Sequence, residues 1–261
     1  MSEEVLSPRE IRRYRKQIML PEIGMEGQEK LKKSKLAVIG AGGLGCPVLQ
    51  YLAAAGAGRI ALVEFDMVDE VNLQRQILYG SGDVGKLKSI IARERLQHLN
   101  SMVDIEIINL RLDASNSLRI LKGYDIIVDA TDNLETRYVI NDSCIILGKP
   151  MVHGAIYKYE GQVSVFNYRS GPTYRCYNPH PGDRRFKNPL PADVGIMGVL
   201  AGITGTIMAN EVIKIITGTG NVLSGKMLLF NISDYSFHLL KIAGIPANHD
   251  IKTLNDLPYS V

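Results

Sequence analysis

The sequence predicts an α/β fold in which helices flank a mostly parallel sheet. Up to about residue 150, short apolar runs alternate with helical segments, as expected for right-handed β-α-β crossovers. One run, YDIIVDA at residues 124–130, has the apolar centre that is typical of a strand buried inside a parallel sheet. Beyond residue 150 the pattern changes to polar and apolar alternation, which predicts antiparallel strands.

The N-terminal segment is expected to form two helices. Ser7-Pro-Arg-Glu10 is a capping box with proline at the first helical position, and it starts an arginine-rich helix that stops at Pro21. A short helix over residues 26–34 leads to the first strand. Further helices are expected after the glycine turn to about Ala55 and over 84–100, 114–123 and 134–148, and parallel strands over 35–40, 59–65, 103–110, 124–130 and 150–156.

The second half of the chain predicts an antiparallel extension of the same sheet. Antiparallel strands are expected over 159–168, 226–232 and 235–242, and a long surface loop over about 177–193, rich in Pro, Gly and charge. We therefore predict one domain, 1–261, with N-terminal helices over 1–34 and two halves, 35–150 and 151–261. This is a Rossmann-like arrangement.

Composition excludes several classes of protein. A net charge of +3 over 261 residues gives no argument for nucleic acid or an anionic membrane. Three cysteines without a CxxC pair, and an N-terminus without an apolar signal, predict a reducing cytoplasm. Residues 194–209 lack charge, but sixteen residues fall short of the roughly 20 that a membrane span needs. We interpret them as a buried helix at the core or at a subunit interface.

A glycine-rich turn follows the first strand. Gly40, Gly42 and Gly45 match G-x-G-x-x-G, Gly43 lies within the same turn, and a helix follows. The free N–H groups at such a helix N-terminus favour phosphate. A tight turn without any ligand is the alternative.

Acidic side chains end the second strand. Glu64 is placed where a carboxylate accepts hydrogen bonds from both hydroxyls of a ribose. The alternative is a solvated strand end. Asp66 would share this role or cap the turn.

The segment NLQRQ follows six residues after Asp66. Asn72, Arg75 and Gln76 are within reach of the same pocket, and a guanidinium there suits a triphosphate because Arg binds phosphate oxygens in bidentate fashion. Lys86 and Lys88 come a dozen residues later. Each basic residue alone would fit a surface charge, but together beside a glycine turn they favour ATP over a hydride-transfer cofactor.

The segment DATDN follows the fourth parallel strand. Asp129 and Asp132 lie at its carboxyl end, where ligands bind in open α/β sheets, and Asn133 comes next. A carboxylate facing phosphates is a natural Mg²⁺ ligand. Asp132 would equally cap the helix that starts near Leu134.

With these elements in place, the chain resembles the MoeB/ThiF/HesA family, relatives of the ubiquitin-activating enzymes. The resemblance runs from about residue 13 to about residue 242. It rests on RYRKQIMLPEIGMEGQEKL, GAGGLG, NLQRQ, VGKLK, VDATDN, GAIYKYEGQVSVF and GITGTIMANEVIKII in the family's order.

The resemblance implies an adenylyltransferase. Such enzymes use Mg-ATP to activate the C-terminal glycine carboxylate of a small ubiquitin-fold sulfur carrier, ending in Gly-Gly, and release pyrophosphate. A separate protein supplies sulfur, and the products feed thiamine, molybdopterin or related metabolites. By motif position Glu64 resembles the ribose ligand and Asp132 the Mg²⁺ ligand. Four further residues resemble the family's phosphate and transition-state contacts: Asn72, Arg75, Gln76 and Lys88.

Departures from the family pattern concern the N-terminal helix. Relatives carry an arginine at the position of Lys16, and it reaches into the ATP site of the partner subunit. The resemblance therefore implies a homodimer in which Lys16, Arg13 or Arg15 takes that role. Lys keeps the charge but loses the bidentate fork.

Further departures concern cysteine. Many relatives hold a structural zinc with two CxxC pairs, of which only Thr173 and Cys176 remain here. His180 and Asp183 do not complete a set of four ligands, so we expect no zinc. Relatives with a reactive cysteine in the loop carry it near Pro191. Without that cysteine, we expect the reaction to stop at the adenylate.

Other functions remain open on the sequence. An NAD-dependent oxidoreductase would use the same glycine turn, with His153 as the nearest catalytic candidate. A carrier-binding scaffold that has lost activity is a second alternative, and the related tRNA-modifying dehydratase branch a third. NLQRQ together with TDN favours the adenylyltransferase, and no residue identifies which carrier or pathway it serves.

Overall fold

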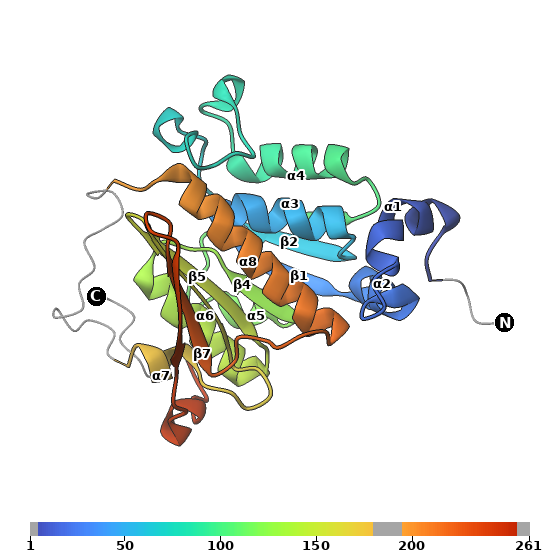
Figure 1. Ribbon diagram of the computed structural model, residues 1–261. Helices are drawn as coiled ribbons and strands as arrows, with labels where there is room; N and C mark the ends of the chain where they lie inside the picture. The colour runs from blue at the N-terminus through green and yellow to red at the C-terminus, as the bar shows by residue number, and fades with distance from the viewer. Residues whose placement is uncertain (1–4, 180–194, 255–261) are drawn as a thin grey trace.

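In a computed structural model, which describes residues 5–179 and 195–254, one eight-stranded sheet runs through the molecule (Figure 1). Its order is β3-β2-β1-β4-β5-β6-β7-β8. The parallel strands are β1 (Lys35–Ile39), β2 (Arg59–Val63), β3 (Asp104–Ile108), β4 (Ile126–Asp129) and β5 (Met151–Tyr157). The antiparallel strands are β6 (Glu160–Phe166), β7 (Lys226–Asn231) and β8 (Ser236–Lys241). The predicted fold class is confirmed.

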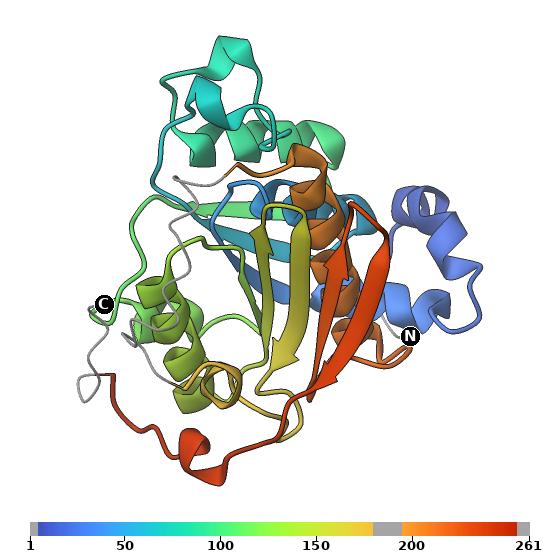
Figure 2. The same cartoon turned by 60° about the vertical axis from the view of Figure 1, so that its left-hand side comes forward.

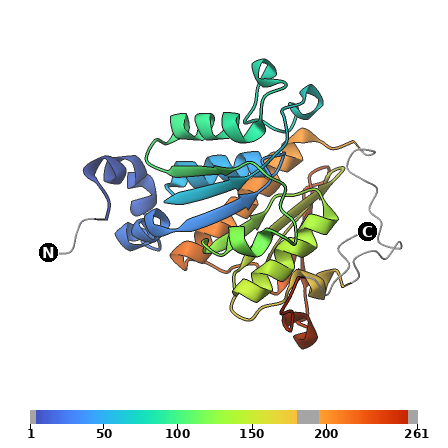
Figure 3. The same cartoon turned by 180° about the vertical axis from the view of Figure 1, so that it is seen from behind.

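Helices cover both faces of the sheet (Figures 1 and 3). One face carries α3 (Gly45–Ala55), α4 (Lys88–Leu99) and α8 (Gly198–Thr217); the other carries α5 (Ser117–Leu121), α6 (Leu134–Leu147) and the short α7 (Tyr174–Tyr177). Strand periodicity explains the two cores, because side chains alternate between faces. Leu36 and Val38 of β1 pack in the first core, whereas Ala37 and Ile39 pack in the second.

The N-terminal helices α1 (Pro8–Ile18) and α2 (Gly24–Lys33) lie beside the sheet at the amino ends of its strands (Figures 1 and 2). The predicted capping box is present: Glu10 N donates to Ser7 Oγ (3.3 Å), and Ser7 N donates to Glu10 Oε2 (2.9 Å). The carbonyl of Ala55, at the carboxyl end of α3, accepts hydrogen bonds from Gln17 and Gln28. These contacts fix α1 to the end of α3 that lies away from the glycine turn.

The apolar helix α8 packs inside the fold. Its length and composition alone would suit a membrane span. It lies against α3, β5 and β6, and buries Leu200, Ala201 and Met208. Gly205 allows the close approach, since a Cβ there would lie 2.4 Å from Pro47 Cγ. The sequence predicted this buried helix from about residue 194; it begins at Gly198.

Helix α4 starts later than the sequence predicted. The expected range was 84–100, but Gly85 has φ +81° and Leu87 pairs with Met67 in an isolated antiparallel bridge. Lys88 N then donates to the carbonyl of Asp66 (2.9 Å). The extended stretch therefore makes Lys88 the first residue of the helix. The predicted loop at 177–193 lies mostly outside the described residues.

Candidate functional site

The glycine turn and the DATDN segment meet at one edge of the sheet. β1 and β4 are neighbours, and from this pair the strand order runs outward in opposite directions, through β2 and β3 on one side and β5 on the other. Ligands of open α/β sheets bind at such a switch point, outside the carboxyl ends of the strands. Both segments leave their strands at these carboxyl ends, so the candidate site lies there (Figure 1).

Backbone geometry explains the glycines of the turn. Gly40 has φ +95°, and a Cβ there would lie 2.9 Å from the carbonyl oxygen of Ala130. A Cβ at Gly45 would lie 2.1 Å from the carbonyl oxygen of Gly40. Among the described residues no side chain caps α3, and its first turn holds no acidic residue. The amino end of α3 therefore keeps N–H groups available for an anion.

Glu64 lies beneath the glycine turn and supports it. Its carboxylate accepts hydrogen bonds from the backbone N–H groups of Ala41, Phe65 and Asp66, each at 2.8 Å. A carboxylate has about four acceptor positions. Glu64 is 6% exposed and three of these positions are occupied, which leaves one for the predicted ribose contact.

Tyr79 binds the carbonyl of Ala41, the residue whose N–H donates to Glu64. Its hydroxyl donates to the carbonyl of Ala41 at 2.9 Å. Burial raises the pKa of Tyr79, so the hydroxyl stays a donor. The sequence does not predict this role for Tyr79, because an aromatic residue three positions past NLQRQ carries no signal of such a long-range contact.

The NLQRQ segment lies against the glycine turn. Arg75 Nη2 donates to Asn72 Oδ1 at 2.6 Å, and a Cβ at Gly43 would lie 3.4 Å from Arg75 Cγ. A Cβ at Gly42 would lie 3.6 Å from Gln76 Nε2. Gln76 is 5% exposed, and its Oε1 has no hydrogen-bond partner within the described chain. A buried amide oxygen without a partner is costly, and a ligand donor in the pocket would satisfy it.

Lys88 lies beside Asp66, which follows β2. Its ammonium is 3.2 Å from Asp66 Oδ2, and the Lys88 side chain is 5% exposed against 52% for Asp66. Asp66 therefore holds a buried cation in place near the ends of β1 and β2. Lys86 behaves differently: its side chain is 56% exposed and pairs with Asp83 at 3.7 Å.

The structure separates the roles of the polar residues in DATDN. Asn133 caps α6, since its Oδ1 accepts from Thr136 N at 3.0 Å. The interpretation of Asp132 as the cap is therefore wrong. Asp132 is exposed and its carboxylate has no partner among the residues described. A free carboxylate beside the glycine turn fits an Mg²⁺ ligand.

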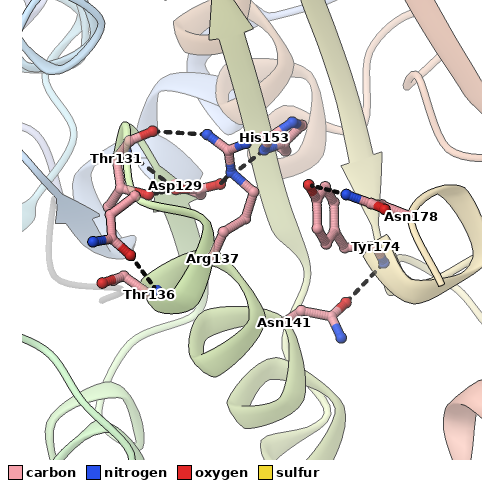
Figure 4. Close-up of polar contacts among 9 residues, drawn as sticks. Asp129, Thr131, Thr136, Arg137, Asn141, His153, Tyr174 and Asn178 are labelled. Atoms are coloured by element: carbon pink, nitrogen blue, oxygen red, sulfur yellow. Dashed lines mark hydrogen bonds and ion pairs between the residues drawn. The ribbon is translucent and has the colours of Figure 1, made fainter. Parts of the chain in front are cut away.

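Asp129 differs from the prediction, because it does not face the pocket. It is the last residue of β4, fully buried, and its carboxylate is occupied (Figure 4). Oδ1 accepts from Thr131 N (3.1 Å) and Thr131 Oγ1 (2.5 Å). Oδ2 contacts Arg137 Nε (3.1 Å) and His153 Nδ1 (2.8 Å). We call Asp129, Arg137 and His153 the Asp129 cluster.

Charge in the cluster is balanced by Arg137. Burial opposes ionisation of Asp129, but Arg137 and His153 outweigh it and hold the pKa of Asp129 below its usual value. Burial and the nearby Arg137 lower the pKa of His153. His153 is therefore a neutral imidazole that donates from Nδ1. Its Nε2 is buried and lacks a partner in the described part of the chain.

The basic residues of α1 lie far from this pocket in the same chain. Arg15 and Lys16 are exposed, and Arg13 donates to the carbonyl of Leu99 at 2.5 Å. Their helix packs at the carboxyl end of α3, whereas the glycine turn opens its amino end. The 11 residues of α3 separate the two ends by about 16 Å.

The described residues do not fit a tetrahedral zinc site. No group of three or more His, Cys, Asp or Glu side chains gathers within residues 5–179 and 195–254. Cys176 instead accepts hydrogen bonds from Ile245 N (3.3 Å) and Asn248 Nδ2 (3.6 Å), with Thr173 Oγ1 at 3.4 Å. His180, Asp183 and the position of Pro191 lie outside the described residues.

Known proteins similar to this chain include adenylyltransferases. The sulfur carrier protein adenylyltransferase of Thermus thermophilus is 47% identical over 242 residues, which cover 91% of this chain and 89% of that protein. The probable adenylyltransferase/sulfurtransferase MoeZ of Mycobacterium tuberculosis is 41% identical over 255 residues, 96% of this chain and 65% of that protein. The chain spans 55% of the adenylyltransferase and sulfurtransferase MOCS3 of Culex quinquefasciatus.

Solved structures show the same fold at lower identity. PaaA superposes with a TM-score of 0.77 and 22% identity over 94% of this chain and 77% of that chain. The structure of E. coli MccB with ATP superposes with a TM-score of 0.75 and 23% identity, over 84% of this chain and 67% of that chain. A sequence model of the ThiF family matches residues 14–250. Site geometry, near relatives and this match agree with the family and the enzyme class expected from the sequence: the chain belongs to the ThiF family, whose relatives found here are adenylyltransferases.

Proposed function

We propose that the protein adenylates the C-terminal glycine carboxylate of a small ubiquitin-fold sulfur carrier with Mg-ATP. A carboxylate oxygen of the carrier attacks the α-phosphorus of ATP. The bond from that phosphorus to the bridging oxygen breaks, and pyrophosphate leaves with the electron pair. The product is a carrier adenylate. No side chain needs to remove a proton, since the glycine carboxylate is ionised at neutral pH.

The polar residues gathered at the switch point support this proposal. Two anions must approach each other, so positive charge has to be fixed in advance. Lys88 is a buried cation held by Asp66, and Arg75 lies over the glycine turn. We assign the ribose to Glu64, the phosphates to the glycine turn with Asn72, Arg75, Gln76 and Lys88, and a supporting contact to Asn133.

Magnesium fits beside Asp132. The carboxylate is exposed and has no partner among the described residues, and oxygen ligands suit this ion. When bound, Mg²⁺ would neutralise charge on the phosphates during transfer. No zinc is proposed, because Cys176 is hydrogen-bonded to backbone and amide groups in the place where a ligand would be needed.

The carrier is proposed to dock on the antiparallel half, residues 151–261. Phe237, Leu239 and Leu240 of β8 are 58%, 58% and 50% exposed. Exposed apolar side chains on an edge strand are typical of a protein interface. β8 belongs to the same sheet as β1 and β4, at whose carboxyl ends the ATP site is proposed (Figure 2). A separate protein in the cytoplasm would then supply sulfur, for thiamine, molybdopterin or a related product.

Pyrophosphate–ATP exchange tests the proposal. The protein is incubated with Mg²⁺, ATP and labelled pyrophosphate, with each Gly-Gly-ended carrier of its organism or with none. We expect exchange with one carrier only. Arg75→Lys should lower the rate by about tenfold or more, because Lys loses the bidentate contact. Arg59→Lys is the matched control, since Arg59 pairs with Glu106 at the other end of β2.

Two results would contradict the proposal. ATP binding without exchange for any carrier would favour a carrier-binding scaffold. Binding of NAD with hydride transfer would favour an oxidoreductase.

A further inference from the structure

The Asp129 cluster encloses a residue next to the proposed Mg²⁺ ligand. Thr131 precedes Asp132, and all three of its polar groups are bound by the cluster (Figure 4). Its N–H and hydroxyl donate to Asp129 Oδ1, and its carbonyl accepts from Arg137 Nη2 at 2.9 Å. Asp132 itself has no partner among the described residues, so the backbone on either side decides where its carboxylate points.

The same turn is fixed on its other side by helix α6. Asn133 caps the helix through Thr136 N, and Arg137 lies one turn further along. Arg137 therefore links the helix to both Asp129 and Thr131. Residue 132 lies between two anchored residues, 131 and 133. Because the Asp132 side chain has no contacts of its own among the described residues, the position of its carboxylate depends on how firmly residues 131 and 133 are held.

His153 completes the cluster from a third element. It lies on β5 and contacts Asp129 Oδ2, and its ring packs against Phe166 and Tyr174 at centroid distances of 5.8 and 5.1 Å. Arg137 already balances the charge of Asp129, so His153 is not needed for neutrality. What it adds is a hydrogen bond that fixes the rotation of the carboxylate, at the cost of an unpartnered Nε2.

We infer that Asp129, Arg137 and His153 act as positioning residues that aim Asp132 at the Mg²⁺ of bound Mg-ATP. The inference rests on the proposed function for the identity of the ligand. It assigns a function to a buried set of residues that touches neither substrate nor metal. Residues that orient metal ligands commonly contribute about 10- to 100-fold to metal affinity.

Paired variants of Thr131 test the inference without leaving a buried charge unpaired. Thr131→Val removes the hydroxyl that donates to Asp129, and Thr131→Ser keeps it. The readout is calorimetric ATP binding in EDTA and at rising Mg²⁺. For Thr131→Val we expect about a tenfold increase in the Mg²⁺ concentration at half-saturation. We expect Thr131→Ser to stay near wild type, and ATP affinity in EDTA to be unchanged in both.

Variants of His153 repeat the test from the other side of the carboxylate. His153→Leu removes the donor, and His153→Asn keeps one near the position of Nδ1. Circular dichroism and Tm show which variants fold. In a pair that folds, the inference holds if Thr131→Val needs more Mg²⁺ than Thr131→Ser, or if His153→Leu needs more than His153→Asn. Equal Mg²⁺ dependence within both pairs would overturn it, and so would a wild-type protein whose ATP affinity does not respond to Mg²⁺.

This readout separates the inference from the proposed function. ATP binding needs no carrier, so calorimetry still decides the role of the cluster if no carrier supports exchange. Loss of exchange with every carrier, together with a normal Mg²⁺ response, would reject the carrier adenylation alone.

Discussion

The polar residues at the proposed site are of two kinds. Some have side chains at the carboxyl edge of the sheet, and others are buried and contact the residues next to them. Lys88, Arg75 and Asp132 have side chains at the carboxyl edge of the sheet. Asp129 is buried below that edge and contacts only the protein. Two carboxylates three positions apart in DATDN therefore differ in role because one lies inside the sheet and the other follows it.

The buried His153 makes the stability of the fold depend on pH. Its folded-state pKa lies below the ordinary value of 6.5, because burial and Arg137 disfavour the charged ring. Below about pH 6.5 the unfolded chain binds a proton that the folded chain does not, so stability falls as the pH falls. Asp129, with a lowered pKa, adds to the loss only below about pH 4.

We therefore expect the free energy of unfolding to decrease from about pH 7 to about pH 5, with a limiting slope of about 1.4 kcal/mol per pH unit. Denaturant unfolding at several pH values measures it. His153→Asn removes the titrating ring and keeps a donor to Asp129, so its curve should be flatter. Asp129, Arg137 and Tyr174 surround the ring and are unchanged in this variant. Parallel curves for both proteins would contradict the assignment.

At the scale of elements, helix α7 and the C-terminal 3-10 turn Pro246–His249 are joined by one sulfur atom. Cys176 accepts hydrogen bonds from Ile245 N and Asn248 Nδ2. Burial opposes ionisation of the thiol, but the bonds from Thr173, Ile245 and Asn248 hold its pKa below the usual value. On the other side, Arg175 makes a buried ion pair with Asp142 of α6, at 2.7 Å. These contacts join α7 to the 3-10 turn and to α6.

We expect the isolated protein to fold without zinc. Dialysis against a chelator should change Tm by less than about 2 °C, since losing a structural zinc removes folding free energy outright. Elemental analysis should find far less than one zinc per chain. A large fall in Tm with release of one zinc per chain would show that residues outside the described ranges complete a site.

At the scale of the whole molecule, one chain does not bring all the proposed site residues together. α1 lies about 16 Å from the glycine turn along α3. Arg15 and Lys16 point into solvent. We propose a symmetric dimer in which α1 of one protomer reaches the proposed site of the other, so that each site needs both chains.

Mixing two inactive variants tests this arrangement. Lys16→Ala and Asp132→Asn are each expected to lose exchange activity, but a mixed dimer has one site with both residues intact. With random reassortment the mixture should regain about a quarter of wild-type activity. Lys88→Ala mixed with Asp132→Asn is the control, because both changes affect the pocket of their own chain and no site is restored. Recovery in neither mixture would mean that Lys16 does not complete the site of the partner chain.

Much of the fold was predictable because it depends on local pattern. Apolar runs alternating with amphipathic segments specify the order of strands and helices, and the glycines of residues 40–45 specify a turn that few other residues can form. The start of α4 was not predictable. The bridge between Met67 and Leu87 overrides helical periodicity over residues 84–87, and such a pairing between distant segments has no local signal.

Motif spacing along single elements was enough to predict the fold class and the enzyme class, and it places the proposed site at the carboxyl edge of the sheet. Which of the proposed residues have free side chains depends on contacts between elements. Asn133 rather than Asp132 caps α6, and Asp129 is bound by Thr131, Arg137 and His153. Those contacts join β4, α6 and β5, and three elements meet at a point only when the whole sheet has formed.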